Sequence, residues 1–195
     1  MPLEGPTVED IKKILGARKE ARIPSDGLKP AAVLVPIFLW EEKWHVLLTR
    51  RSQKVEHHKG EISFPGGHVD DDDENNCSAA LREAEEEVGV PPDKVEILGR
   101  LDDIVTITGF RVRPFVGRIE YPYQFVASDD EIEEIILLPL SGFVEPDRCV
   151  KSVHDRGGEP YAIYFFKVDG YTVWGATAKI LVQLLKLILG FEEPC

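Results

Sequence analysis

The strongest constraint on the fold of this sequence is a pair of glycines, Gly66 and Gly67, followed by an acidic loop and a short helix. The helix is expected within residues 77–90, because apolar residues recur there at the 4-3-4 spacing of one buried stripe. That stripe consists of Cys77, Leu81, Ala84 and Val88. Gly89 is expected to cap the helix, and the two prolines that follow would prevent it from continuing. The sequence therefore predicts a glycine-led loop that delivers the chain into an amphipathic helix.

A different face of this helix carries three glutamates, Glu83, Glu86 and Glu87. Like charges four residues apart destabilise a helix by about 0.2–0.5 kcal/mol. Many glutamate runs are solvated faces, but solvated faces usually alternate in sign, whereas this face concentrates one sign. Carbonyls of the glycine pair can approach a ligand closely and would complete an all-oxygen ligand set, which suits Mg²⁺ or Mn²⁺. The helix is interpreted as a metal site, with a solvated surface as the alternative.

The spacing of these residues resembles the Nudix box. The matching residues are the glycine pair, Glu74 and the run Arg82-Glu83-Ala84-x-Glu86-Glu87-x-Gly89-Val90. Between the glycine and the Arg-Glu pair, this chain has one residue more than the common form, within residues 69–73. The coenzyme A diphosphatase branch of the Nudix enzymes is similar in this respect.

A second resemblance to that branch precedes the glycines. The branch carries Leu-Leu-Thr-x-Arg-Ser, then an arginine, a glycine and Phe-Pro-Gly-Gly, each separated by three residues. This chain matches at residues 47–52, at Gly60 and at residues 64–67, but Glu56 stands where the branch has arginine. If that arginine contacts a substrate phosphate, the acid leaves the exact substrate open, and Lys54 or Lys59 would supply the charge.

The resemblance implies an α/β fold, the Nudix α/β/α sandwich with a mixed β-sheet. It covers about residues 30–190 of a single domain, 1–195, in which residues 1–28 form an N-terminal helix and lead-in. It implies metal-dependent hydrolysis of a diphosphate linkage, with coenzyme A or an acyl-CoA cut to 3′,5′-ADP and a phosphopantetheine. Two alternatives stay open: a diphosphatase for ADP-ribose or another nucleoside diphosphate derivative, and a catalytically silent nucleotide-binding protein. Silent members usually lose box glutamates, which this chain keeps.

The resemblance also implies the metal ligands and the base. Glu83, Glu86 and Glu87 are expected to hold Mg²⁺ or Mn²⁺, together with a carbonyl of Gly66 or Gly67. The ions would bridge diphosphate oxygens, absorb charge and lower the pKa of a bound water. The base is expected to be Glu83 or a loop glutamate.

The loop glutamate is Glu131 or Glu134, and the sequence does not choose between them. Arg82 is expected to orient the glutamates, with Glu74 as its partner. The expected catalytic residues are therefore Arg82, Glu83, Glu86 and Glu131.

Basic residues near the glycines are expected to hold substrate phosphates. Arg111 and Arg113 project to one face of a predicted strand, where they are either phosphate ligands or surface residues. The expected substrate-binding residues are Arg50, Arg51, Lys54, Gly66, Gly67 and Arg111.

Two other polar clusters are interpreted without metal. Adjacent histidines in a strand point to opposite faces, so His57 and His58 are not expected to share an ion, and a hydrogen bond from His58 is favoured. The four aspartates at residues 70–73 are expected to form a solvated loop rather than a second metal site.

Periodicity and turn residues predict the remaining elements. Helices are expected over residues 7–15, with Thr7 as N-cap, and 179–189. Strands are expected at residues 31–40 and 44–51, and a strand pair at residues 95–108 and 110–120. A hairpin is expected at residues 161–174, turning at Asp169-Gly170.

Composition limits the partners. A chain of 195 residues with a net charge of −12 suits one domain, and its charge opposes binding to nucleic acid or to an anionic membrane surface. Three cysteines without metal-ligand spacing, an acidic N-terminus and no long apolar run predict a cytoplasmic protein. A small nucleotide-derived substrate is the expected partner, and an exposed flank of the last helix would suit a homodimer.

Overall fold

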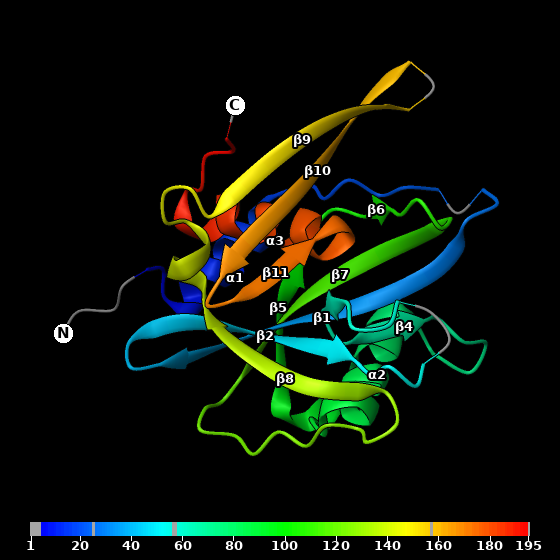
Figure 1. Cartoon of the computed structure of the whole chain (residues 1–195). Helices are drawn as coiled ribbons and strands as arrows, with labels where there is room; N and C mark the ends of the chain where they lie inside the picture. The colour runs from blue at the N-terminus through cyan, green and yellow to red at the C-terminus, as the bar shows by residue number, and fades with distance from the viewer. Residues whose placement is uncertain (1–4, 25, 56–57, 157, 195) are drawn as a thin grey trace.

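The computed structural model describes residues 5–24, 26–55, 58–156 and 158–194 (Figure 1). Within this part, a mixed sheet of eight strands lies between helix α2 on one face and helices α1 and α3 on the other (Figure 1). A second sheet of three strands packs against α3. This arrangement confirms the predicted α/β sandwich with a mixed β-sheet.

The helices are α1 (Val8–Ala17), α2 (Asn76–Val88) and α3 (Gly175–Leu189). The large sheet contains β1 (Lys29–Trp40), β2 (Lys43–Arg51), β3 (Ile62–Ser63), β4 (Gly66–His68), β5 (Val95–Arg100), β6 (Ile104–Val105), β7 (Phe110–Ile119) and β8 (Ile132–Pro139). The small sheet contains β9 (Cys149–Arg156), β10 (Glu159–Val168) and β11 (Tyr171–Trp174). Two 3-10 turns complete the connections: η1 (Pro92–Lys94) lies between α2 and β5, and η2 (Leu140–Phe143) lies between β8 and β9.

Strand β1 is apolar along most of its length because both of its faces are covered. Leu34 and Phe38 join the core under α2, whereas Val35 and Ile37 join the core that α1 and α3 share. The strand pairs in parallel with β7 and antiparallel with β2 and β4. It therefore positions β4, which carries the glycine pair, against the rest of the sheet.

Helix α1 begins at the predicted cap. The Thr7 side chain accepts a hydrogen bond from the Asp10 N–H, and the Asp10 carboxylate accepts one from the Thr7 N–H, which completes a capping box. Ile11 and Leu15 are buried on the inward face.

The strand predicted at residues 95–108 is wrong as a single element. It breaks into β5 and β6, both of which pair with β7. The interruption exists because Asp102 and Asp103 bind the N-terminal lead-in: Asp102 accepts from the Ala21 N–H, and Asp103 accepts from the Ile23 N–H. Tertiary contacts of polar side chains thus override the local alternation of apolar residues.

Two β-hairpins have turn residues in the left-handed conformation. Asp169 and Gly170 have φ of 48° and 83°, the left-handed conformation that a two-residue turn requires, and the turn between β10 and β11 is confirmed. Glu41 and Glu42 adopt similar angles between β1 and β2. Strand β9, which pairs with β10, was not predicted.

Helix α3 begins four residues before the predicted start and lies mostly in the core. Its buried residues include Ile180, Leu181 and Leu184, and its exposed position is the polar Lys186. Most of the flank considered for a homodimer is therefore packed within the protein itself. In the described part of the chain, no helix is long and apolar enough to cross a membrane.

Candidate active site

Helix α2 begins and ends at its caps. The Asn75 side chain accepts hydrogen bonds from the N–H groups of Cys77 and Ser78. Gly89 has a φ of 70°, and its N–H donates to the Glu85 carbonyl at 3.0 Å. The predicted glycine cap is confirmed, and it ends the helix at Val88.

The buried face of α2 is rotated from the predicted stripe. Ala84 and Val88 are buried as expected, but Cys77 and Leu81 are only half-buried. Glu87 instead lies on the buried face, with a residue exposure of 2%. The helix therefore carries a carboxylate into the interior, which its amphipathic pattern alone does not reveal.

The glycine pair, which leads into the predicted loop, itself forms strand β4 beside β1. A Cβ on Gly66, whose φ is 152°, would lie 2.4 Å from the Ala32 carbonyl oxygen of β1. A Cβ on Gly67 would lie 2.5 Å from Oε1 of Glu83. Gly66 thus leaves room for the backbone of β1, whereas a methyl group on Gly67 would have to displace the flexible carboxylate of Glu83.

Glu87 is held at the base of the site by two donors. Arg51 Nη1 lies 3.4 Å from Oε1, and the Gly66 N–H donates to Oε2 at 3.3 Å. Burial nevertheless raises the pKa of Glu87 to about 8, although the Arg51 charge opposes the shift. The charge of Glu83, one turn away, adds to the increase.

Glu83 is also a partly desolvated carboxylate. Burial raises its pKa above the ordinary value, while Arg82 lowers it and the charges of Glu86 and Glu131 raise it further. The carboxylates of Glu83 and Glu87 are thus partly desolvated, and they repel each other and the carboxylate of Glu131. Such a cluster is stabilised by a cation.

Arg82 connects the acidic loop to the helix. Its Nε and Nη2 donate to the two carboxylate oxygens of Asp73 at 3.1 and 3.0 Å. Its Nη1 contacts Glu83 at 3.0 Å and Glu86 at 3.2 Å, and Nη2 also donates to the His68 carbonyl at 3.2 Å. The prediction that Arg82 orients the glutamates agrees with these contacts.

The prediction that Glu74 is the partner of Arg82 is wrong, because Asp73 takes this place. The Glu74 side chain is exposed, whereas the Asp73 side chain is only 6% exposed and forms the bidentate pair. The loop also turns on itself, because the Asp70 N–H donates to Asp73 and the Asp73 N–H donates to the Asp70 carbonyl. The expectation of a solvated loop therefore holds for Asp71 and Asp72 but not for Asp73.

The segment after β7 returns beneath the C-terminus of α2 and carries Glu131 to the site. The N–H groups of Val126 and Ser128 donate to the carbonyls of Val88 and Glu87, which satisfies two carbonyls at the helix end. The Ser52 N–H then donates to the Glu131 carbonyl at 2.7 Å. This anchoring explains why the Glu131 charge acts on both helix carboxylates.

Glu134 points elsewhere. It lies opposite Arg50 in the β2–β8 pair, its Oε2 is 3.2 Å from Arg50 Nη2, and it accepts a hydrogen bond from the Tyr171 hydroxyl at 2.7 Å. The structure thus separates the two loop glutamates that the sequence left open, with Glu131 on the side of the acidic helix.

The predicted substrate-binding residues do not all converge. Arg51 faces Glu87, whereas Arg50 faces the opposite side of β2, toward Tyr171. Lys54 donates to the Asp129 carbonyl at 3.0 Å, which keeps it beside the Glu131 segment.

Arg111 lies apart from this group, near the N-terminal lead-in, where its Nη1 contacts the Ile23 carbonyl at 3.5 Å. Arg113, its predicted companion, forms a bidentate pair with buried Asp103 at 2.9 Å. Its guanidinium is therefore engaged in an ion pair with Asp103. The hydrogen bond predicted for His58 is confirmed, with Glu61 at 2.9 Å, while Glu56, His57 and Cys195 lie outside the described residues.

The donor chemistry of the site fits a divalent cation. Glu83 and Glu87 supply carboxylate oxygens in a desolvated position, where burial, and to a lesser extent the neighbouring carboxylates, raises their pKa values. Glu86 is 59% exposed and bound to Arg82. Among the described residues, no three acidic, histidine or cysteine side chains already form a metal-binding group. The structure therefore contains carboxylate oxygens of the type and charge that a divalent cation needs, but these oxygens are not yet arranged as a complete coordination sphere.

Comparison with known proteins identifies the family. The family model described as the NUDIX domain matches residues 28–149. A protein of Citrobacter koseri named "Uncharacterized Nudix hydrolase NudL" is 38% identical over 156 residues, which are 80% of this chain and 81% of the relative. The chain belongs to the NUDIX family. A protein of the same name from Escherichia coli K12 is 39% identical over the same shares of both chains.

A solved structure of a MutT/nudix family protein from Enterococcus faecalis supports the Nudix fold. It matches with a TM-score of 0.51 at 16% identity, over 91% of this chain and 68% of the other. This chain is thus a Nudix hydrolase, an enzyme that cleaves a diphosphate linkage in a small nucleotide-derived substrate, in a family that generally uses divalent metal ions. Helix α3 lies beyond the matched range and yet packs into the same core as β1.

Proposed function

We propose that this Nudix hydrolase cleaves the diphosphate of coenzyme A or an acyl-CoA into 3′,5′-ADP and a phosphopantetheine. The observation that carries the proposal is the contact between Arg51 and Glu87. Arg51 belongs to the sequence signature that resembles the coenzyme A diphosphatase branch, and Glu87 belongs to the Nudix helix. This contact between a residue of the branch signature and a glutamate of the Nudix helix supports the proposal.

The roles of the residues follow from their positions. Glu83 and Glu87, with Glu86 and a carbonyl of Gly66 or Gly67, would hold Mg²⁺ or Mn²⁺. When bound, the ion supplies charge neutralisation for the diphosphate oxygens and activation of water. Arg51 fixes Glu87, Arg82 fixes Glu83, and the missing side chain of Gly67 leaves room for the Glu83 carboxylate.

Glu131 is proposed as the base. Its backbone is anchored under the C-terminus of α2, its charge acts on both helix carboxylates, and its exposed side chain can accept a proton from water. Water adds across one phosphorus–oxygen bond, so one product phosphate gains the hydroxyl and the other leaves with the bridging oxygen. Lys54, hydrogen-bonded to the Asp129 carbonyl, would contribute positive charge near the leaving phosphate.

A diphosphatase for ADP-ribose is the alternative substrate class, because Glu56 departs from the branch signature. The test is hydrolysis of coenzyme A and of ADP-ribose, each with Mg²⁺ and with Mn²⁺, with products identified by mass spectrometry. The proposal expects 3′,5′-ADP from coenzyme A at a kcat/KM at least tenfold above that for ADP-ribose. Preferential cleavage of ADP-ribose would reject the proposed substrate while leaving the diphosphatase assignment intact.

Glu85→Gln is the matched control for any test of the helix carboxylates. Glu85 lies on the same helix as Glu86 and Glu87, but it is exposed and outside the site. Glu87→Gln should abolish turnover, whereas Glu85→Gln should retain it. A silent nucleotide-binding protein would instead show no turnover in any form and equal ligand binding in all.

A homodimer and a cytoplasmic location remain predictions from the sequence. Most apolar residues of helix α3 lie in the core, which removes most of the exposed flank on which the dimer prediction was based. Sedimentation equilibrium at micromolar concentration tests the oligomeric state directly.

A further inference from the structure

A cavity of about 380 Å³ lies where the end of β2 and the segment before β3 meet the turn into β11. Its walls include Arg50 from β2, Gln53 and Lys59 from the intervening segment, and Tyr171 and Trp174 from β11. None of the aromatic residues in this wall was predicted to belong to a site. The volume is at the lower end of small-ligand pockets, so it suits one part of a larger molecule.

Two aromatic rings shape one wall of this cavity. The Arg50 guanidinium lies over the Tyr171 ring, 5.4 Å from its centroid. Trp174 stacks on Phe165 at an interplanar angle of 7°, with centroids 6.3 Å apart, yet 42% of the residue is exposed. Because Phe165 stacks on one face of the indole, the exposed part of the indole offers a rigid surface on which another ring can stack.

Some charged groups of the cavity form ion pairs with other described residues, and others do not. Arg50 is fixed by Glu134, which the Tyr171 hydroxyl also contacts. In the described part of the chain, Lys59 is exposed and has no ion pair, and Glu133 likewise has none, although both line the cavity. The cavity thus offers a cation and an acid beside an aromatic wall.

We propose that this cavity binds the 3′-phosphoadenosine end of the substrate, an inference that rests on the proposed function. The base of a nucleotide presents a flat π-surface to Trp174 and an amino donor to a carboxylate such as Glu133. The phosphate suits Lys59, with Arg50 as a second cation. The pantetheine arm would use neither cation, because it is neutral.

The cavity is connected to the acidic helix through β2. The contacts of the consecutive residues Arg50 and Arg51 lie on different sides of the strand, with Arg50 at Tyr171 beside the cavity and Arg51 at Glu87. A substrate with its diphosphate at Glu87 would pass around the end of β2 to reach Trp174. Trp174 and Lys59 are therefore specificity residues rather than catalytic ones.

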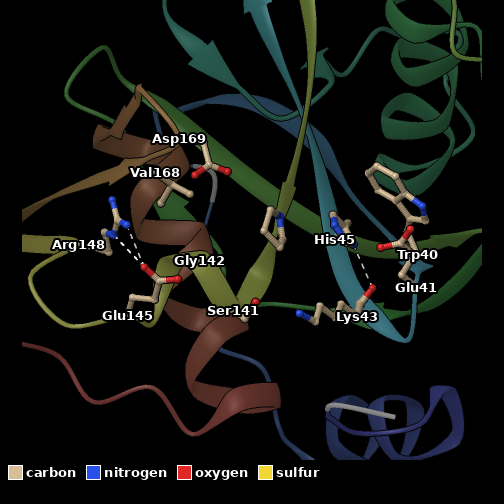
Figure 2. Close-up of a pocket in the computed structure, with 11 residues that line it drawn as sticks. Trp40, Glu41, Lys43, His45, Ser141, Gly142, Glu145, Arg148, Val168 and Asp169 are labelled. Carbon is tan, nitrogen blue, oxygen red and sulfur yellow. Dashed lines mark hydrogen bonds and ion pairs between the residues drawn. The ribbon is translucent and has the colours of Figure 1, made fainter. Parts of the chain in front are cut away.

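Another cavity, of about 280 Å³, provides an internal comparison (Figure 2). It lies beside the turn between β1 and β2 and is lined by Trp40, which is 43% exposed. Its polar groups are largely satisfied: Arg148 is paired with Glu145 at 2.9 Å, and His45 Nδ1 lies 3.0 Å from the Lys43 carbonyl (Figure 2). Trp40 therefore matches Trp174 in exposure without offering a comparable ligand site.

The first test is direct binding of 3′,5′-ADP to the full-length protein, measured by isothermal titration calorimetry. Trp174→Ala should weaken binding about tenfold or more, as expected for removal of one base-stacking ring. Lys59→Ala should weaken the binding of 3′,5′-ADP. It should leave the binding of AMP almost unchanged, because AMP lacks the 3′-phosphate. Trp40→Ala should bind like the wild type. Equal binding by the wild type, Trp174→Ala and Lys59→Ala would overturn the proposal.

The second test separates this inference from the proposed function. In steady-state hydrolysis, Lys59→Ala should raise KM for coenzyme A but not for dephospho-coenzyme A, with kcat unchanged. If the wild type binds 3′,5′-ADP at Trp174 but cleaves no coenzyme A, the proposed function fails and the cavity assignment stands. If the wild type cleaves coenzyme A and the variants show unchanged KM, the cavity assignment fails alone.

Discussion

Replacing Asp73 should disable the site by releasing Arg82. In the bidentate pair, Arg82 donates to both Asp73 oxygens while its Nη1 contacts Glu83 and Glu86. Asp73→Asn keeps the shape but removes the charge and turns one acceptor into a donor that faces the guanidinium. Arg82 would then lose the contact that fixes its orientation, and Glu83 would lose its partner.

The size of the effect follows from the burial of the pair. Hydrogen bonds to charged groups contribute about 1.5–3 kcal/mol each, and the 31% exposure of Arg82 reduces this, so we expect a loss of about 2 kcal/mol in the free energy of unfolding. For a chain of this size, that loss lowers Tm by roughly 4–8 °C. Residues that orient metal ligands typically change activity about 10–100-fold, so kcat should fall by that factor.

Glu74→Gln is the matched control, because Glu74 is adjacent and exposed. Its Tm and kcat should stay close to those of the wild type in thermal melts and in coenzyme A hydrolysis. The Arg82 contact lowers the pKa of Asp73, so its contribution to stability is present at neutral pH and is lost as pH falls through the folded pKa, below about 4. The Tm difference between the wild type and Asp73→Asn should therefore vanish in acid. A large loss in Glu74→Gln together with none in Asp73→Asn would refute this assignment.

Three further predictions concern the glycine pair, Glu87 and the cap of α1. Gly67→Ala should lower kcat at least tenfold with a small change in Tm, because the new methyl displaces the Glu83 carboxylate, whereas Gly66→Ala should mainly lower Tm, because it meets the backbone of β1. Glu87 has a pKa raised to about 8, so the metal-free protein should lose stability as pH rises from about 4 to 8. Glu87→Gln should flatten that dependence in thermal melts, and a pH profile unchanged by the substitution would contradict the burial argument. Thr7→Ala should cost about 1 kcal/mol in urea unfolding at unchanged activity, since it removes the α1 cap.

Local signals in the sequence predicted the elements that depend on a few neighbouring residues. Gly89 ends α2 because only its left-handed conformation closes the helix, and Asp169-Gly170 forms the tight turn for the same conformational reason. The acidic helix and its glycine pair could be recognised because their spacing is long. What could not be predicted is that Glu87 lies on the buried face of the helix, because an amphipathic pattern assigns charged side chains to the solvent side.

Choices between neighbouring acids depended on three-dimensional contacts. Asp73 rather than Glu74 reaches Arg82 because the loop closes through Asp70, and this turn has no periodic signature. Glu134 pairs with Arg50 because of the β2–β8 register, which includes a bulge that no sequence pattern announces. In both cases the sequence predicted the correct type of residue, an acid. Which of the neighbouring acids makes the contact could be determined only from the folded structure.

The central claim is that the carboxylates of α2 bind the divalent ion required for diphosphate cleavage. Mn²⁺ titration followed by electron paramagnetic resonance tests this claim most directly, with the wild type compared with Glu87→Gln and Glu85→Gln. We predict tight binding by the wild type and Glu85→Gln, and at least tenfold weaker binding by Glu87→Gln. Equal Mn²⁺ affinity in the wild type and Glu87→Gln would contradict the account.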